Sequence, residues 1–218
     1  MMDTASLSGP RERAGSKNLL GRYSLTVCSS PRLVWFRNAK VGTRTLYHLL
    51  KDASVSFEIE HEFKVPFDPE QYGAYFKFAF VRNPWDRFVS GWKNKINPRK
   101  VGFMKLSAEQ IDTFQDIGKF AEHLATLDPQ TCNSHFRSQS ALIEPDAVDY
   151  LGRFESFEAD VRAIFGRLHL TLPDTFPHRN RSKREGSYQD YFTPRVRDLI
   201  GQFYRDDIKR FGYSFERG

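Results

Sequence analysis

A nearly continuous apolar stretch, followed at once by a helix start, is the feature that most restricts the fold of this chain. Residues 75–81 are mostly hydrophobic, which is typical of a strand buried on both faces of a parallel sheet. Asn83 can cap a helix, and Pro84 occupies a first-turn position. The apolar residues that follow recur at helical spacing: Trp85, Phe88, Val89, Trp92 and Ile96. The sequence therefore predicts a buried strand that turns directly into an amphipathic helix.

Strands and helices alternate along the rest of the chain. Strands are expected at residues 32–37, 55–59 and 148–154. Helices are expected to begin at Thr43, near Ile117, after Ser156 and at Thr193–Pro194. This order predicts an α/β fold with a central, mostly parallel sheet flanked by helices.

The length of 218 residues fits a single domain over residues 19–218, preceded by a polar, flexible leader at residues 1–18. No apolar run exceeds four residues. A membrane helix needs about 20 such residues and a signal-peptide core about 7–15. We therefore expect no stable membrane anchor and a cytoplasmic location. The two cysteines, Cys28 and Cys132, agree with a reducing compartment.

Basic residues gather in two stretches. The net charge is +6, and residues 77–105 hold eight Lys or Arg but one acid. Residues 178–188 hold four Lys or Arg but one acid. Such clusters suit an anionic partner, but for charge clusters alone a solvated surface is the better explanation.

The loop at residues 38–45 combines the groups that bind phosphate. Gly42 lets the backbone approach a ligand closely, Lys40 supplies a charge, and Thr43 and Thr45 supply hydroxyls. The loop lacks the first glycine and the Lys-Ser/Thr pair of a Walker A motif, and no Walker B strand is evident. A magnesium-dependent nucleotide hydrolase is therefore disfavoured.

The strand at residues 75–81 ends in a second candidate anion loop. Arg82 stands at the end of the strand, and Ser90 lies two turns into the following helix. An arginine and a hydroxyl can hold a second phosphate, so one ligand with two separated phosphates would bridge both loops. Arg87 can join them or pair with Asp86 on its own helix.

At this point the sequence resembles a known family. Residues 40–43 and the pattern Arg82, Pro84, Arg87 and Ser90 resemble the two cofactor motifs of sulfotransferases that use 3′-phosphoadenosine 5′-phosphosulfate (PAPS). The carbohydrate (Golgi-like) branch and its bacterial relatives are the nearer match, over roughly residues 31–215. Later stretches, including residues 134–139 and 151–155, resemble that branch too. Ala39 and Arg44 depart from its usual first motif.

The resemblance implies a P-loop-like three-layer fold and a role for each motif residue. Lys40 would act on the leaving phosphate oxygens, and the 5′-phosphosulfate would lie in the loop formed by Val41, Gly42, Thr43, Arg44 and Thr45. Arg82 and Ser90 would hold the 3′-phosphate. A late basic loop would cover the nucleotide through Lys183, Arg184 and Ser187. Sulfuryl transfer to a hydroxyl, with PAP as product and no metal, is the implied reaction, and a glycan is the implied acceptor.

The general base has two candidates. His61, expected just after the strand at residues 55–59, comes from the region that supplies a base in related enzymes, and His135 is its rival. Glu60 and Glu62 are weaker alternatives.

Three other interpretations stay open at this stage. They are a P-loop-type nucleotide kinase, a nucleic-acid-binding module built on the basic clusters, and a relative that binds PAPS without turnover. The absence of a nucleic-acid recognition motif argues against the second, and we expect no nucleic-acid partner.

Overall fold

The structure, a computed structural model, describes residues 21–96, 99, 102–173, 176 and 186–216. Five strands form one sheet in the order β3-β1-β2-β4-β5. The strands are β1 Arg22–Ser29, β2 Arg32–Phe36, β3 Ile59–Pro66, β4 Phe76–Val81 and β5 Tyr150–Arg153. β2 pairs parallel with β4, and β4 with β5, while β1 is antiparallel to both β2 and β3. The α/β expectation is confirmed, but the sheet is mixed, so the prediction of a mostly parallel sheet is wrong.

The error has a local cause at β1. This strand forms a hairpin with β2, in which Val27 pairs with Val34 across a short turn. A hairpin turn closes antiparallel strands without a helical crossover, so the strand–helix alternation gives no sign of it. β1 and β3 together extend the parallel part of the sheet by two antiparallel strands, and β3 forms the edge.

β3 also differs from its prediction. The strand was expected at residues 55–59, but it begins at Ile59 and runs to Pro66, so His61 lies within the strand and not after it. Val55 instead packs in the core behind the preceding helix. Six of the eight residues of β3 are exposed. Ile59, Phe63 and Val65 do alternate with charged residues, so the strand signal is present in the sequence, but the prediction assigned it to the preceding segment.

The helices begin where the capping residues predict. The longer ones are α1 Thr43–Asp52, α2 Pro84–Lys95, α4 Ile117–Ala125, α5 Phe157–Arg167 and α6 Pro194–Phe203. The side chains of Asn83 and Thr193 accept amide hydrogen bonds at the starts of α2 and α6. Ser156 precedes α5 without such a bond, because its hydroxyl donates to Asp160 instead. Two short helices, α3 Ala108–Thr113 and α7 Arg205–Phe211, were not predicted.

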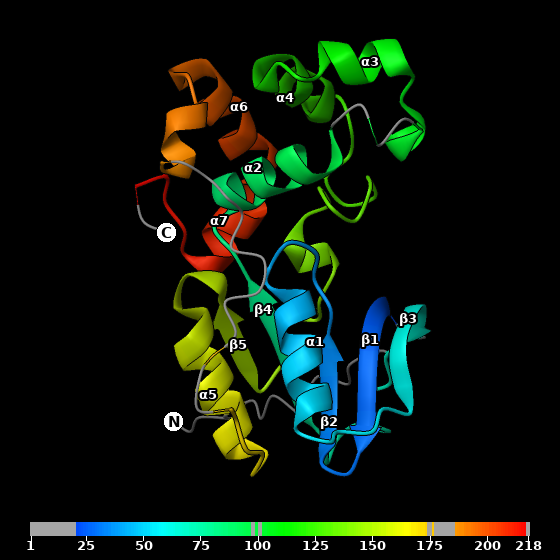
Figure 1. Cartoon of the computed structure of the whole chain (residues 1–218). Helices are drawn as coiled ribbons and strands as arrows, with labels where there is room; N and C mark the ends of the chain where they lie inside the picture. Colours follow the sequence, from blue (N-terminus) through cyan, green and yellow to red (C-terminus); the bar gives the residue numbers. More distant parts are fainter. Residues whose placement is uncertain (1–20, 97–98, 100–101, 174–175, 177–185, 217–218) are drawn as a thin grey trace, which may run out of the picture.

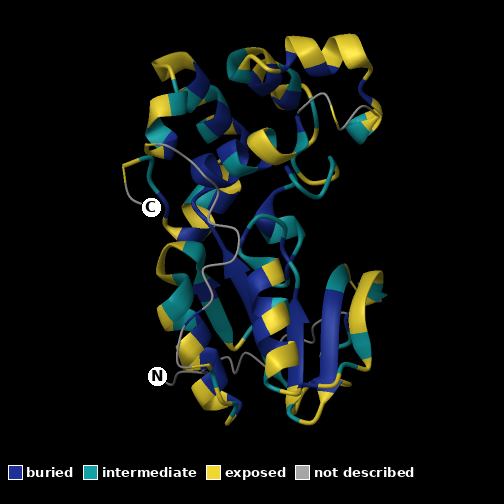
Figure 2. Cartoon of the chain, viewed as in Figure 1, coloured by how far each residue is buried: buried dark blue, intermediate teal, exposed yellow. Residues whose placement is uncertain are grey.

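Helices α1 and α5 cover one face of the sheet, where Leu49 and Ile164 pack against Trp35 and Phe78 (Figure 1). The opposite face is covered mainly by residues 67–75, residues 142–148 and the end of α7. A third core lies beyond the carboxyl ends of β2 and β4, where α2, α4 and α6 pack together (Figure 1). Figure 2 shows the central strands buried and the outer helix faces exposed. Helices α2, α4 and α6, which we call the second helical group, therefore lie at the end of the sheet, next to the loops that follow β2 and β4.

No helix in the described part of the chain is long and apolar enough to cross a membrane. The expected leader at residues 1–18 lies outside the described residues. The cytoplasmic location and the single domain both stay predictions.

The cap of α2 holds the second loop in place. Asn83 is fully buried, accepts from the amides of Trp85 and Asp86, and donates to the carbonyl oxygen of Ser214 at 2.9 Å. We expect Asn83→Ala to lower the free energy of unfolding by about 1–2 kcal/mol, since helix amides lose their acceptor. Asn83→Ser keeps the cap and should lose less, as urea denaturation will show. Equal losses in both variants would contradict this assignment.

Candidate functional site

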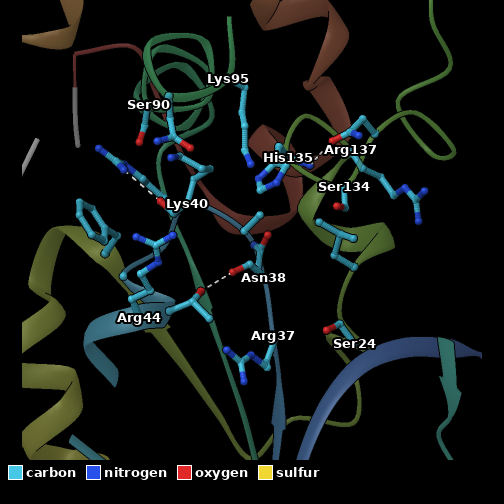
Figure 3. A pocket seen from close by; sticks show the side chains of 18 of the residues that line it. Ser24, Arg37, Asn38, Lys40, Arg44, Ser90, Lys95, Ser134, His135 and Arg137 are labelled. Carbon is cyan, nitrogen blue, oxygen red and sulfur yellow. Dashed lines mark hydrogen bonds between the residues drawn. The ribbon is translucent and has the colours of Figure 1, made fainter. Parts of the chain in front are cut away.

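A large pocket opens where β2 and β4 end, between the sheet and the second helical group. Its volume is about 1790 Å³, and ten of its lining residues are Lys or Arg, against three Asp or Glu. Among the predicted residues it is lined by Lys40, Gly42, Thr43, Arg44, Thr45, His61, Arg82, Ser90 and His135. Figure 3 shows Lys40, Arg44 and Ser90 gathered on one side, with Lys95 and His135 across from Lys40. The strong cationic excess suits an anionic ligand.

The loop between β2 and α1 is tightly closed. The hydroxyl of Thr43 donates to the carbonyl oxygen of Asn38 at 2.6 Å. Gly42 has a φ of 82°, and a Cβ there would lie 2.6 Å from the ring of Phe157. Only glycine fits this position, because both the backbone angle and the space exclude a side chain. Lys40 also takes a left-handed φ, of 72°, which points its side chain into the pocket (Figure 3).

The second loop begins with Arg82, which is 5% exposed. Its guanidinium makes an ion pair with Asp86 at 2.7 Å and donates to the carbonyl oxygen of Lys40 at 2.9 Å. The guanidinium also stacks 4.0 Å above the ring centroid of Phe154. Arg82 therefore joins the second loop to the first while lining the pocket.

Arg87 is buried and links the first loop to the segment at residues 134–137. It donates to the carbonyl oxygen of Ala39 at 3.1 Å and to that of Arg137 at 2.8 Å. Asp86 pairs with Arg82, so the alternative pairing of Arg87 with Asp86 is not formed. Arg87 fixes the loop backbone and does not line the pocket.

Lys40 stands among like charges. Burial, and then the nearby cations Arg82, Lys95, Arg44 and Arg87, lower its pKa to about 8. A bound anion would offset this repulsion and raise the pKa of Lys40 again, so that the ammonium form would persist to higher pH.

The two candidate bases lie on different walls of the pocket. His61 comes from β3, and burial, followed by the charge of Arg37, lowers its pKa below the usual value. Its ring lies 4.6 Å from that of Phe63. His135 lies near Phe103, at 5.8 Å between ring centroids, and its amide donates to Asn133.

Several predicted residues lie elsewhere. The side chain of Val41 is buried in the core behind the loop. Ser187 caps the short 3-10 helix η5 (Tyr188–Tyr191) and does not line the pocket. Lys183 and Arg184 lie outside the described residues. Glu60 accepts a hydrogen bond from Tyr47, and neither Glu60 nor Glu62 lines the pocket.

The structure adds lining residues that the sequence did not single out. Arg37 and Phe63 come from the hairpin side, Lys95 and Arg137 from the helical side, and Phe154 follows β5. They are distant in sequence, and no motif spacing connects them. No group of three or more His, Cys, Asp or Glu that could hold a metal occurs within the described ranges.

A profile of the sulfotransferase family matches residues 25–214, which is most of the chain. The chain belongs to the sulfotransferase family. Carbohydrate sulfotransferase 14 of Mus musculus is 26% identical over 191 residues, covering 76% of this chain and 50% of the relative. Carbohydrate sulfotransferase 11 of Rattus norvegicus is 28% identical over 187 residues, covering 74% and 53%. The match to carbohydrate sulfotransferases confirms the resemblance found in the sequence.

This sulfotransferase-family chain spans about half the length of the curated relatives it matches. No solved structure matches the chain.

The lowered pKa of Lys40 has a consequence for stability. The pKa is about 8 in the folded protein, against 10.5 for a lysine free of such surroundings, so the charged amine destabilises the fold. The cost is complete below pH 8 and disappears as the pH rises toward 10.5. We expect Lys40→Met to raise the free energy of unfolding by about 1–2 kcal/mol at pH 7, a value reduced for partial solvent screening. Urea denaturation should show that the stability gained by Lys40→Met is smaller at pH 9.5 than at pH 7. A gain that increases with pH would contradict the prediction.

Proposed function

We propose that this chain transfers a sulfuryl group from PAPS to a hydroxyl of a carbohydrate acceptor. One observation carries the proposal: Lys40 and Arg82, from adjacent strand–helix loops, line one cationic pocket and are joined by a hydrogen bond of 2.9 Å. A donor with phosphate groups at two positions would contact both loops. Family membership favours sulfuryl transfer over the kinase and nucleic-acid alternatives.

The donor would lie along the two loops. Gly42, Thr43, Arg44 and Thr45 would surround the 5′-phosphosulfate, and the backbone of Val41 would close the loop behind it. Arg82 and Ser90 would hold the 3′-phosphate. The strand–loop–helix geometry supports the P-loop-like description of these units, which we extend to the fold as part of the same proposal.

The transfer itself is a displacement at sulfur. The acceptor oxygen forms a bond to sulfur while the bond from sulfur to the 5′-phosphate oxygen breaks, and the acceptor proton passes to a base. Lys40, which lines the pocket, would stabilise the negative charge that develops on the leaving phosphate oxygen. The lowered pKa of Lys40 would rise again in the presence of this charge.

His61 is our choice of base. Its lowered pKa favours the neutral form near pH 7, and it lines the pocket from β3, a different strand from those that precede the two donor loops. His135 lies across the pocket from Lys40 (Figure 3), and both His135 and Lys95 lie near the ring of Phe103.

A ring-shaped acceptor fits the wall that carries His61. Phe63 is 69% exposed, lines the pocket and lies directly beside His61. The C–H face of a sugar ring can stack on such an aromatic side chain while a ring hydroxyl reaches the histidine. The pocket exceeds the roughly 300–1,000 Å³ of a typical ligand site, which leaves space for donor and acceptor together. The relatives named carbohydrate sulfotransferases support the same acceptor class.

Binding of the product nucleotide tests the donor assignment. PAP should raise the melting temperature by mass action. We expect Ser90→Ala and Arg82→Ala to weaken PAP binding by about tenfold or more, since each removes a phosphate contact. Lys119→Ala, a position outside the pocket, is the matched control and should bind normally.

Radiolabelled sulfate should pass from PAPS into members of a glycan panel. If Mg·ATP stabilises the protein and saturating PAP does not, the donor assignment is wrong.

The two histidines can be separated by kinetics. We expect His61→Ala to lower kcat by about 100-fold or more, whereas His135→Ala should retain most of the activity. In the unaltered protein, kcat/KM should decrease as the pH drops and His61 becomes protonated. The midpoint of this decrease should lie below pH 6.5, because the pKa of His61 is lowered from that ordinary value. This acid limb should be absent from His61→Ala. The opposite pattern in the two variants would assign the base to His135.

A further inference from the structure

A buried glutamine links the two loops that we assign to the donor. Gln139 begins the short 3-10 helix η3 (Gln139–Ala141) and is completely buried. Its side-chain oxygen accepts from the Nδ2 of Asn38 at 3.0 Å and from the backbone amide of Arg82 at 2.9 Å. Its side-chain nitrogen donates to the carbonyl oxygen of Arg82 at 2.8 Å. One amide group thus holds the first residues of both loops.

The geometry leaves only one chemical type of side chain at this position. The oxygen meets two N–H donors, while the nitrogen meets a carbonyl oxygen. A carboxylate lacks the donor, a lysine lacks the acceptor, and an apolar side chain lacks both. In a buried network of this kind, an unmatched group is costly and displaces its neighbours.

The glutamine is itself anchored from the far side. Its backbone amide donates to Asp207 of α7 at 2.6 Å, and the same carboxylate accepts from the amide and hydroxyl of Ser140. Asp207 is fully buried. The backbone at Gln139 is therefore anchored to α7 by contacts that do not involve its side chain or the two loops.

We propose that Gln139 is a positioning residue that sets the separation of the two donor-phosphate sites. It contacts Asn38, two residues before Lys40, and Arg82 itself, so its length determines how far apart these loops stand. The inference rests on the proposed function, because the separation matters only if one donor spans both loops. The pocket-lining residues touch the donor, whereas Gln139 acts through them.

The substitution Gln139→Glu gives a test that pH can reverse. As a carboxylate, the new side chain cannot donate to the carbonyl oxygen of Arg82; as a carboxylic acid, it can. Burial raises the pKa of such a group, so it should protonate in mildly acidic solution. We expect PAP affinity to fall at least about tenfold at pH 8, relative to the unaltered protein, and this ratio to recover by about pH 5.5. Gln139→Met has similar size but no hydrogen bonds, and should stay weak at both pH values.

Two further measurements isolate the positioning role. Ser140→Ala removes a bond to Asp207 without touching the side chain of Gln139, so it should lower the melting temperature but keep normal PAP affinity. In the ligand-free protein, Gln139→Met should raise the pKa of Lys40 from about 8, since looser loops reduce its burial and its contact with Arg82. NMR of isotopically methylated lysine measures this shift without any donor.

A failure of the positioning role of Gln139 can be distinguished from a failure of the proposed function. If both Gln139 variants bind PAP like the unaltered protein, or if the ratio for Gln139→Glu does not change with pH, Gln139 does not set the separation. If the unaltered protein does not bind PAP, the proposed function fails, and an unchanged pKa of Lys40 in Gln139→Met would then overturn the positioning role as well.

Discussion

The site depends on holding like charges together. Lys40 and Arg82 belong to loops that repel one another, yet both loops face the same pocket. Two hydrogen bonds from arginine guanidinium groups to loop carbonyl oxygens oppose this repulsion: Arg82 to Lys40 and Arg87 to Ala39. A guanidinium can serve both purposes, because it carries a fixed charge and several donors in a planar fork. The backbone is therefore held by the same type of residue that makes the pocket cationic.

This arrangement is stable only because its charges are distributed unevenly. Asp86 neutralises Arg82 at 2.7 Å, and Arg87 is enclosed by carbonyl oxygens. Lys40 is instead partly buried among other cations, and burial followed by their repulsion lowers its pKa. A protein that keeps an unfavourable charge at one position gains the ability to bind an anion there more tightly. The destabilised residue and the residue proposed to act on the leaving group are the same.

Much of this could be predicted from the sequence, since the governing signals are local. The apolar run that ends at Val81, the cap at Asn83 and the glycine at position 42 each determine nearby structure, and each appears as expected. The wrong predictions concern β1 and β3, which depend on pairing between distant segments. The contact of Gln139 with Asn38 and Arg82 spans 101 and 57 residues along the chain. A single sequence contains no spacing rule that would connect them.

In the mixed sheet, the residues proposed to bind the donor and those proposed to meet the acceptor lie on different strands. The loops proposed to bind the donor follow β2 and β4, which pair in parallel at the centre, whereas His61 and Phe63 lie on β3, at the edge of the sheet beside β1. β3 pairs with β1 and not with β2 or β4, so its side chains can be replaced without altering any residue of the central pairing. On the proposed assignment, substitutions on β3 can therefore change acceptor preference while the two loops proposed to bind the nucleotide keep their residues.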